Sequence, residues 1–158
     1  MTKKELAEEY FRKGANCAQA VLCAFAPECG LAEEQAMRLA SGFGGGVGRL
    51  REVCGAVSGM TLVVNILCGN TDFADKEAKD RHYALVRRLA EEFRSRTGSI
   101  ICRELLGETR AGKDSPVSEQ RTRAYYETRP CPGLVAIAAE IVEKELAKQS
   151  TSRFLRRR

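Results

Sequence analysis

Hydrophobic and polar positions divide the chain into amphipathic segments with helical spacing, arranged around one uncharged stretch. Residues 53–71 carry no charged side chain, although 30% of the protein is charged. Apolar residues occur on every side of a helical projection of this stretch, and Gly69 lies where a helix C-terminal glycine is expected. The pattern predicts a buried central helix over about Gly55 to Cys68, with Cys54 at its N-terminus.

The other segments predict further helices. Apolar spacings of three and four, with capping residues before them and glycine or proline after them, indicate their bounds. The predicted elements are a helix from Thr2 to Gly14, helices over 16–27, 33–41 and 73–96 (the longest), a helix capped by Ser99, a polar connection over 107–117, a short helix over 118–126, and a last helix capped by Cys131. With a composition rich in helix-forming residues and poor in aromatics, the sequence predicts an all-α, single-domain helical bundle around a central buried helix.

Charge and hydropathy limit the kinds of partner that the protein is expected to bind. Residues 1–149 are predicted to form one cysteine-containing domain and 150–158 a frayed basic tail, which supplies four of the excess charges in a net charge of +5. The remaining chain has no basic surface of the kind that binds nucleic acid. The N-terminus lacks an apolar signal region, and polar residues interrupt the uncharged stretch, so a cytoplasmic protein without a membrane partner is expected.

A glycine-rich loop over 42–48 precedes Cys54. It matches neither dinucleotide nor P-loop patterns, because the required glycine or lysine and the preceding strand are missing, so no nucleotide is expected. Its glycines allow the backbone to approach the core or a cofactor at Cys54. Gly55 and Gly59, one helical turn apart, leave a face that another backbone or a small cofactor can approach. The candidate cofactor-binding residues are Gly45, Gly46, Gly55 and Gly59.

Seven cysteines is a high number for a cytosolic chain of 158 residues, and it suggests metal or redox chemistry. No CxxC pair occurs, which disfavours thioredoxin-like chemistry and the usual zinc-ribbon sites. Four cysteines fall in the first turns of predicted helices, where the helix dipole and free N–H groups favour a thiolate. These four, Cys17, Cys54, Cys102 and Cys131, could hold a [2Fe–2S] or [4Fe–4S] cluster, hold one zinc, or form reversible disulfides.

The other three cysteines and the only histidine are expected to be part of the packing of the protein rather than of its chemistry. Cys23, Cys29 and Cys68 are expected to be core or adventitious thiols. His82, the only histidine, lies on the apolar stripe of the helix over 73–96 and is expected to be a hydrogen-bonded core or boundary residue, with metal ligation as the minority alternative. Glu52 lies close to Cys54 in sequence and is a weaker candidate for a supporting role.

Several sequence motifs together resemble the C_GCAxxG_C_C family, whose members are described as redox-active. The motifs are NCAQAVL around Cys17, FGGGVGR and EVCGAVSG around Cys54, CRELLG at Cys102, and a lone Cys131 before an Ala/Ile/Glu-rich helix. The resemblance extends over about Leu6 to Leu146. It implies a small helical protein, often encoded near transporter genes, and a related segment occurs in split-Soret cytochromes with an iron–sulfur centre.

The leading hypothesis is electron transfer or redox sensing through the four-cysteine site, most consistent with an iron–sulfur cluster. A second is a thiol–disulfide oxidoreductase with Cys54 as the redox thiol and nucleophile. A third is a non-enzymatic zinc-binding or metal-carrier protein linked to a transporter system. The sequence leaves open whether the protein is an enzyme, which redox partner or substrate it uses, and its oligomeric state.

Overall fold

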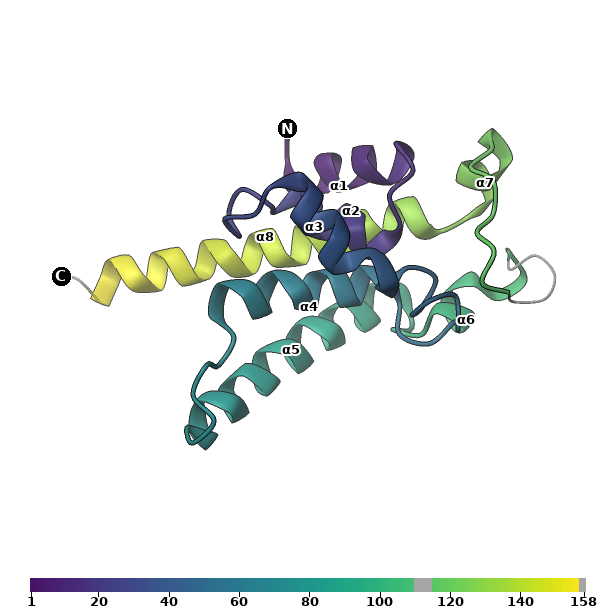
Figure 1. Cartoon of the computed structure of the whole chain (residues 1–158). Coiled ribbons are helices and arrows are strands. Elements are labelled where there is room, and N and C mark those ends of the chain that lie inside the picture. Colours follow the sequence, from purple (N-terminus) through teal and green to yellow (C-terminus); the bar gives the residue numbers. More distant parts are fainter. Residues whose placement is uncertain (110–114, 157–158) are drawn as a thin grey trace.

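Helices make up the regular structure of the chain (Figure 1). The computed structural model describes residues 1–109 and 115–156. Its elements are α1 (Lys3–Arg12), α2 (Cys17–Ala24), α3 (Glu33–Ala40), the 3₁₀ turn η1 (Ser41–Phe43), α4 (Gly55–Cys68), α5 (Lys76–Thr97), α6 (Cys102–Leu106), the 3₁₀ turn η2 (Gly107–Thr109), α7 (Arg123–Thr128) and α8 (Cys131–Arg156). The predicted all-α, single-domain fold is confirmed.

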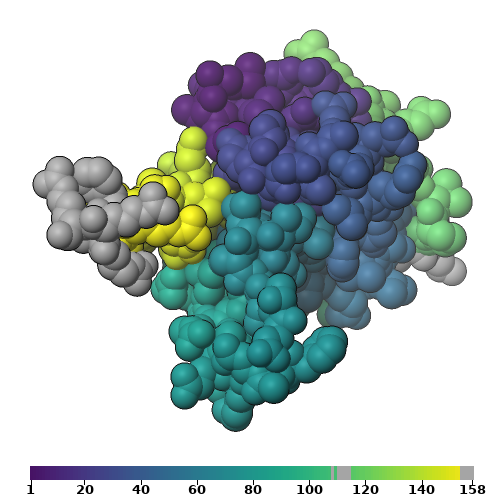
Figure 2. Space-filling model, turned by 60° about the vertical axis from the view of Figure 1, so that its left-hand side comes forward, coloured from purple at the N-terminus to yellow at the C-terminus, as the bar shows by residue number. Residues whose placement is uncertain are grey.

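The helices pack around α8, which crosses the molecule from one end to the other (Figure 1). It contacts α1, α2, α4 and α5 along its length. In the space-filling view the N-terminal helices lie above and the segment containing α4 and α5 lies below, with the C-terminal part of α8 emerging between them (Figure 2). Every long helix therefore buries one side against α8.

Helix α4 has the bounds that the sequence predicts and packs against α2, α5 and α8. Its buried residues Ala56, Met60, Val63 and Val64 form the middle of the core. Burial is not complete, because Ile66 in the last turn is 38% exposed. Helix α4, which the sequence predicts as the centre of the bundle, is therefore buried at its N-terminal end and reaches the surface at its C-terminal end.

Local capping explains where the first helices begin. The Thr2 side chain accepts the Glu5 backbone N–H, and the Glu5 carboxylate accepts the Thr2 N–H at 2.8 Å. Asn16 forms the same reciprocal pair with Gln19 at the start of α2. Such boxes satisfy N–H groups that have no partner inside the helix. Both starts agree with the sequence analysis.

Two predicted helix starts are displaced in the structure. Helix α5 begins at Lys76 rather than near residue 73, because the Asp75 side chain accepts the N–H of Ala78 at 2.9 Å. Helix α7 begins at Arg123 rather than at residue 118, with Thr122 as its cap. In each case a capping oxygen closer to the helix sets the boundary.

The starts of α6 and α8 and the end of α8 also differ from the sequence prediction. Ile101 rather than Ser99 precedes α6, which makes Cys102 its first residue, and Cys131 is the first residue of α8 rather than its cap. Helix α8, with 26 residues, is longer than α5 with 22. It continues through residues 150–156, where a frayed tail was expected. Of the polar connection predicted over 107–117, residues 110–114 lie outside the described part.

Strand pairing is limited, within the described residues, to one isolated antiparallel bridge between Val53 and Ile101. The described helices also include none with both the length and the apolar character that crossing a membrane requires.

Candidate four-cysteine site

The four cysteines predicted at helix N-termini line one small cavity of about 50 Å³. Cys17, Cys102 and Cys131 are the first residues of α2, α6 and α8, and Cys54 is the N-cap of α4. Four helix N-termini therefore meet at the cavity. The other three cysteines do not line it.

The bridge between Val53 and Ile101 brings two of these cysteines together. The Cys54 N–H donates to the Ile100 carbonyl at 2.7 Å, and the Cys102 N–H donates to the Glu52 carbonyl at 2.6 Å. Glu52 thus supports the site through its backbone. Its carboxylate pairs with Arg103 at 2.6 Å in an exposed position.

The glycine-rich loop turns with a left-handed backbone beside the cavity. Every residue from Gly45 to Arg49 has a φ between 54° and 71°, and Arg51 has a φ of 61°. This conformation suits glycine but costs about 1–2 kcal/mol for each residue with a Cβ, such as Val47. The N–H groups of residues 47–52 donate back to carbonyls of residues 42–47, which holds the turn closed. A strained, well-bonded segment therefore forms one wall of the site.

Of the four candidate cofactor-binding glycines, Gly45, Gly46 and Gly55 line the cavity. Within the described residues, the N–H groups of Gly45 and Gly46 donate to no protein acceptor. Gly59 does not line the cavity and lies instead at the crossing of α4 with α2, where an added Cβ would be 2.8 Å from the Ala18 carbonyl oxygen. The expected close approach at Gly59 is therefore to a backbone and not to a cofactor.

Gly46 provides a test of how the loop positions Cys102. A Cβ at Gly46 would lie 2.7 Å from the Cys102 Cβ, whereas a Cβ at Gly48 would meet no atom within 4 Å. Both glycines have a positive φ, so alanine at either position introduces backbone strain of similar size, about 1–2 kcal/mol. We expect Gly46→Ala to lower metal retention or Cys102 reactivity by about tenfold. Gly48→Ala should change thermal stability alone, and equal metal or thiol effects from the two would contradict this role.

Three arginines surround the cavity, and the sequence analysis did not identify them. Arg51, Arg121 and Arg129 all line it, and Arg51 Nη1 donates to the Cys102 sulfur at 3.8 Å. Arg51 is 4% exposed and Arg129 is 7% exposed. Arg51 and Arg129 precede Cys54 and Cys131 by two or three residues, which is a usable sequence signal. No comparable signal marks Arg121, whose place depends on the folded chain.

A comparison with known families matches residues 15–145, which include all four cavity cysteines. The family is described as "Putative redox-active protein (C_GCAxxG_C_C)". The chain belongs to the C_GCAxxG_C_C family. Comparison with curated proteins and with solved structures gives no match. The resemblance inferred from the motifs is thus confirmed.

Burial controls the protonation of Cys54 in this C_GCAxxG_C_C protein. Burial raises the pKa of the Cys54 thiol to about 12, although the N–H groups of Ala56 and Val57 favour the thiolate. Burial also raises the pKa of Cys102, against the opposing effect of Arg51. The helix N-terminus alone therefore does not make Cys54 a thiolate, because loss of hydration outweighs it.

Cys17 and Cys131 behave as a pair. Their side chains share a hydrogen bond, which together with burial raises the pKa of Cys17 well above its ordinary value. The same bond and the nearby Arg129, Arg121 and Arg51 lower the pKa of Cys131. Of the four thiols, Cys131 is the one that its surroundings favour as a thiolate.

The arrangement of the four sulfurs in the C_GCAxxG_C_C site can be compared with what zinc and an iron–sulfur cluster each require of their ligands. Among the described residues, no group of three or more His, Cys, Asp or Glu side chains is arranged to hold one metal ion. A single zinc needs its sulfurs about 2.3 Å from one point, whereas the cysteines of an iron–sulfur cluster bind two or more irons and need not converge on one point. Four thiols lining one cavity, with arginines beside them, match the four-thiolate ligand set of such a cluster.

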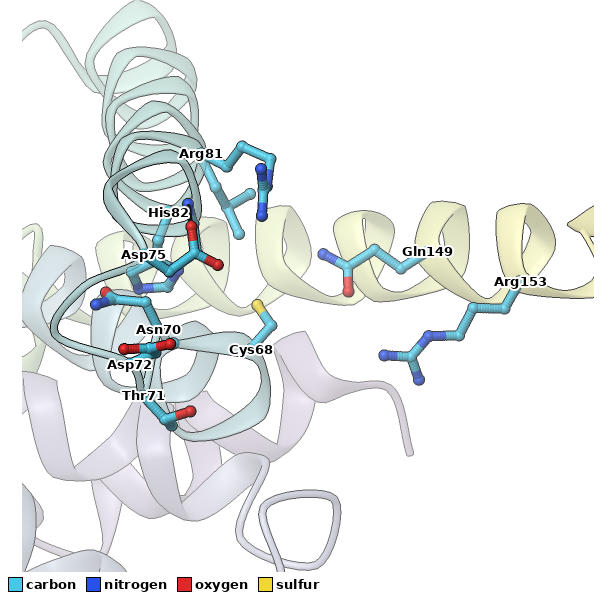
Figure 3. A pocket seen from close by; sticks show the side chains of 12 residues that line it. Cys68, Asn70, Thr71, Asp72, Asp75, Arg81, His82, Gln149 and Arg153 are labelled. Atoms are coloured by element: carbon cyan, nitrogen blue, oxygen red, sulfur yellow. Dashed lines mark hydrogen bonds between the residues drawn. The ribbon is translucent and has the colours of Figure 1, made fainter.

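Cys68 and His82 lie away from the four-cysteine cavity, in a pocket at the C-terminal end of α4 (Figure 3). Asp72 and Asp75 lie on the same wall as His82, whereas Arg153 extends from α8 (Figure 3). His82 is 9% exposed, and its Nε2 lies 2.6 Å from the Asn65 Oδ1. The expectation of a hydrogen-bonded core or boundary histidine is confirmed. Cys23 is buried and Cys29 is partly buried in the core, away from the cavity.

Proposed function

We propose that the protein transfers or senses electrons through an iron–sulfur cluster held by Cys17, Cys54, Cys102 and Cys131. The observation that carries this proposal is that four helix N-termini deliver four thiols to one small cavity. The family description as redox-active supports it at the coarser level. When bound, such a cluster supplies one-electron chemistry at a potential set by its surroundings.

The residues around the cavity have the properties that an anionic cluster requires. Four thiolates bring more negative charge than the metal core neutralises, so a buried site needs cations and N–H donors. Arg51, Arg121 and Arg129 supply positive charge at the cavity wall. The N–H groups of Gly45 and Gly46 can donate to sulfur. Hydrogen bonds of this kind raise the potential and hold the ligands in position.

The deciding experiment is purification without oxygen, followed by a visible absorption spectrum and analysis for iron, sulfide and zinc. We expect a brown protein with stoichiometric iron and sulfide. A protein that is colourless under these conditions, contains zinc and lacks iron would replace this proposal with a structural zinc or metal-carrier protein. If iron and zinc are both absent, counting free thiols before and after reduction would test a working disulfide.

The contact between Cys17 and Cys131 favours a second candidate, a thiol–disulfide protein. Oxidation would join the two sulfurs and pass their two electrons and two protons to an external disulfide, which becomes two thiols. In this case Cys131 is a better attacking thiolate than Cys54, which the sequence analysis favoured. The hydrogen bond with Cys17 is the largest effect that lowers the pKa of Cys131, and three nearby arginines add to it, whereas burial dominates at Cys54.

Alkylation of reduced, metal-free protein distinguishes these two thiols. The pKa of Cys131 is lowered, so its reaction with iodoacetamide should level off below the pH at which ordinary cysteines do. Because the Cys54 pKa is about 12, its rate should still rise about tenfold per pH unit up to pH 10. Peptide mapping by mass spectrometry gives a separate pH profile for each thiol, so unequal access does not affect the comparison. Parallel profiles would contradict the assignment.

A further inference from the structure

A second hollow of about 350 Å³ adjoins the four-cysteine cavity on its outer side. The two share lining residues, among them Arg51, Arg121, Tyr125 and Arg129. The larger hollow adds Arg49 and Glu119, which do not line the cavity. We call it the arginine vestibule and define it by Arg49, Arg51, Glu119, Arg121, Tyr125 and Arg129. Its lining includes the exposed residues Ser41, Gly48 and Pro116, so it opens to the surface.

Positive charge predominates in this vestibule. Its described lining contains four arginines and one carboxylate, that of Glu119. Glu119 pairs with Arg129 and lies 3.9 Å from Arg49. The Arg49 side chain is 15% exposed and the Arg129 side chain is 4% exposed, so much of this charge is shielded from water. Leaving Arg51 aside, the described lining still sets one carboxylate, that of Glu119, against the three guanidinium groups of Arg49, Arg121 and Arg129.

Aromatic rings and carbonyls hold one of these cations in place. The Arg121 guanidinium lies 4.5 Å from the ring centre of Phe11 and 4.7 Å from that of Tyr125. It also donates to the carbonyls of Phe11 and Ala15 at 3.4 and 3.2 Å. A guanidinium that is already oriented loses little side-chain entropy when it binds an anion. Arg121 is therefore held in place before any ligand enters.

We propose that the arginine vestibule binds a small carboxylate- or phosphate-bearing anion and selects anionic redox partners for the cysteine cavity. Guanidinium groups bind both kinds of oxyanion through paired N–H donors. The selection of redox partners rests on the proposed function, whereas anion binding itself does not.

A substitution at Arg49 distinguishes anion binding from a simpler role of the arginines, which is to balance negative charge in the cysteine cavity. Arg51, Arg121 and Arg129 line the cavity as well, so each could serve only to balance thiolate or cluster charge. Arg49 lines the vestibule alone. A change at Arg49 should therefore weaken anion binding and leave the cysteine chemistry in place.

Titration calorimetry with citrate and, separately, with inorganic phosphate tests the binding site on the full-length protein. We expect one anion per chain, with binding that weakens as sodium chloride is added. Arg49→Gln should raise the dissociation constant about tenfold, and Arg49→Lys should raise it less because the charge remains. Arg87→Gln on the exposed face of α5 is the matched control and should have no effect. Absence of citrate and phosphate binding to the wild-type protein, or equal weakening by Arg49→Gln and Arg87→Gln, would overturn the proposal.

Two oxidants of opposite charge test the second part of the proposal, which is the selection of anionic redox partners. The anaerobically reduced protein would pass one electron to ferricyanide, an anion, or to hexaammineruthenium(III), a cation. We expect the ratio of the two rates, anion to cation, to fall about tenfold in Arg49→Gln and to stay constant in Arg87→Gln. An unchanged ratio would overturn the selection of anionic partners. If neither oxidant accepts an electron, the proposed function fails, while the calorimetry still decides whether the anion site exists.

Discussion

Cys54→Ser is expected to remove bound iron and sulfide from the anaerobically purified protein, whereas Cys68→Ser should retain both. Cys54 caps α4 and lines the four-cysteine cavity, so a hydroxyl at this position leaves the cluster without one of its four ligands. Cys68 lies at the other end of the same helix, in a separate pocket. We expect at least a tenfold loss of iron per chain for Cys54→Ser, measured together with visible absorption.

The pair is well matched because both substitutions replace one sulfur by oxygen on α4 or its cap. Circular dichroism would show that both variants keep their helices. Equal loss of iron from the two variants would show that the site does not lie at the N-terminus of α4. Retention of iron by Cys54→Ser, with a changed spectrum, would show that oxygen replaces sulfur as a ligand and would leave the location of the site intact.

Gly59→Val should cause the largest loss of thermal stability among the glycine variants. A Cβ at this position would lie 2.8 Å from both the Ala18 carbonyl oxygen and the Val21 Cβ, so α2 would have to move away from α4. Overpacking at a backbone contact costs about 3 kcal/mol, and a chain of this size then melts roughly 6–12 °C lower. Calorimetric or dichroism melting curves provide the measurement.

Gly133→Ala is the control for glycine replacement inside a helix. Gly133 lies in α8, and its added Cβ would meet no atom within 4 Å. Alanine has the better helix propensity by about 1 kcal/mol, so this variant should melt roughly 2–4 °C higher. If Gly59→Val melted at the wild-type temperature, the close crossing of α2 and α4 would be wrong.

Local sequence signals predicted the framework of the fold and the positions of the cysteines. Asn16 and Thr2 cap helices through contacts within three residues, so their effect can be read without tertiary information. The bounds of α4 follow from an uncharged run between Cys54 and Gly69. Placing four cysteines at helix starts required only these boundaries, and the packing of the helices then brought the thiols to one cavity.

The electrostatic surroundings of the site could not be predicted in the same way. Arg121 reaches the cavity because it stacks on Phe11, which is more than a hundred residues earlier in the chain. The left-handed φ of Val47 and Arg49 goes against the local preference of residues with a Cβ. Burial raises the pKa of Cys54, and burial is a property of the packed molecule. These features depend on contacts between distant segments.

A bond or shared cluster between Cys17 and Cys131 would fasten the start of α2 to the start of α8. The loop closed in this way contains most of the chain. By chain entropy, such a cross-link disfavours the unfolded state by about 4.7 kcal/mol for a loop of roughly 100 residues. Loss of the cross-link would increase the unfolded population and expose the chain to proteases. The chemical state of the four thiols would then determine how long the protein survives in the cell.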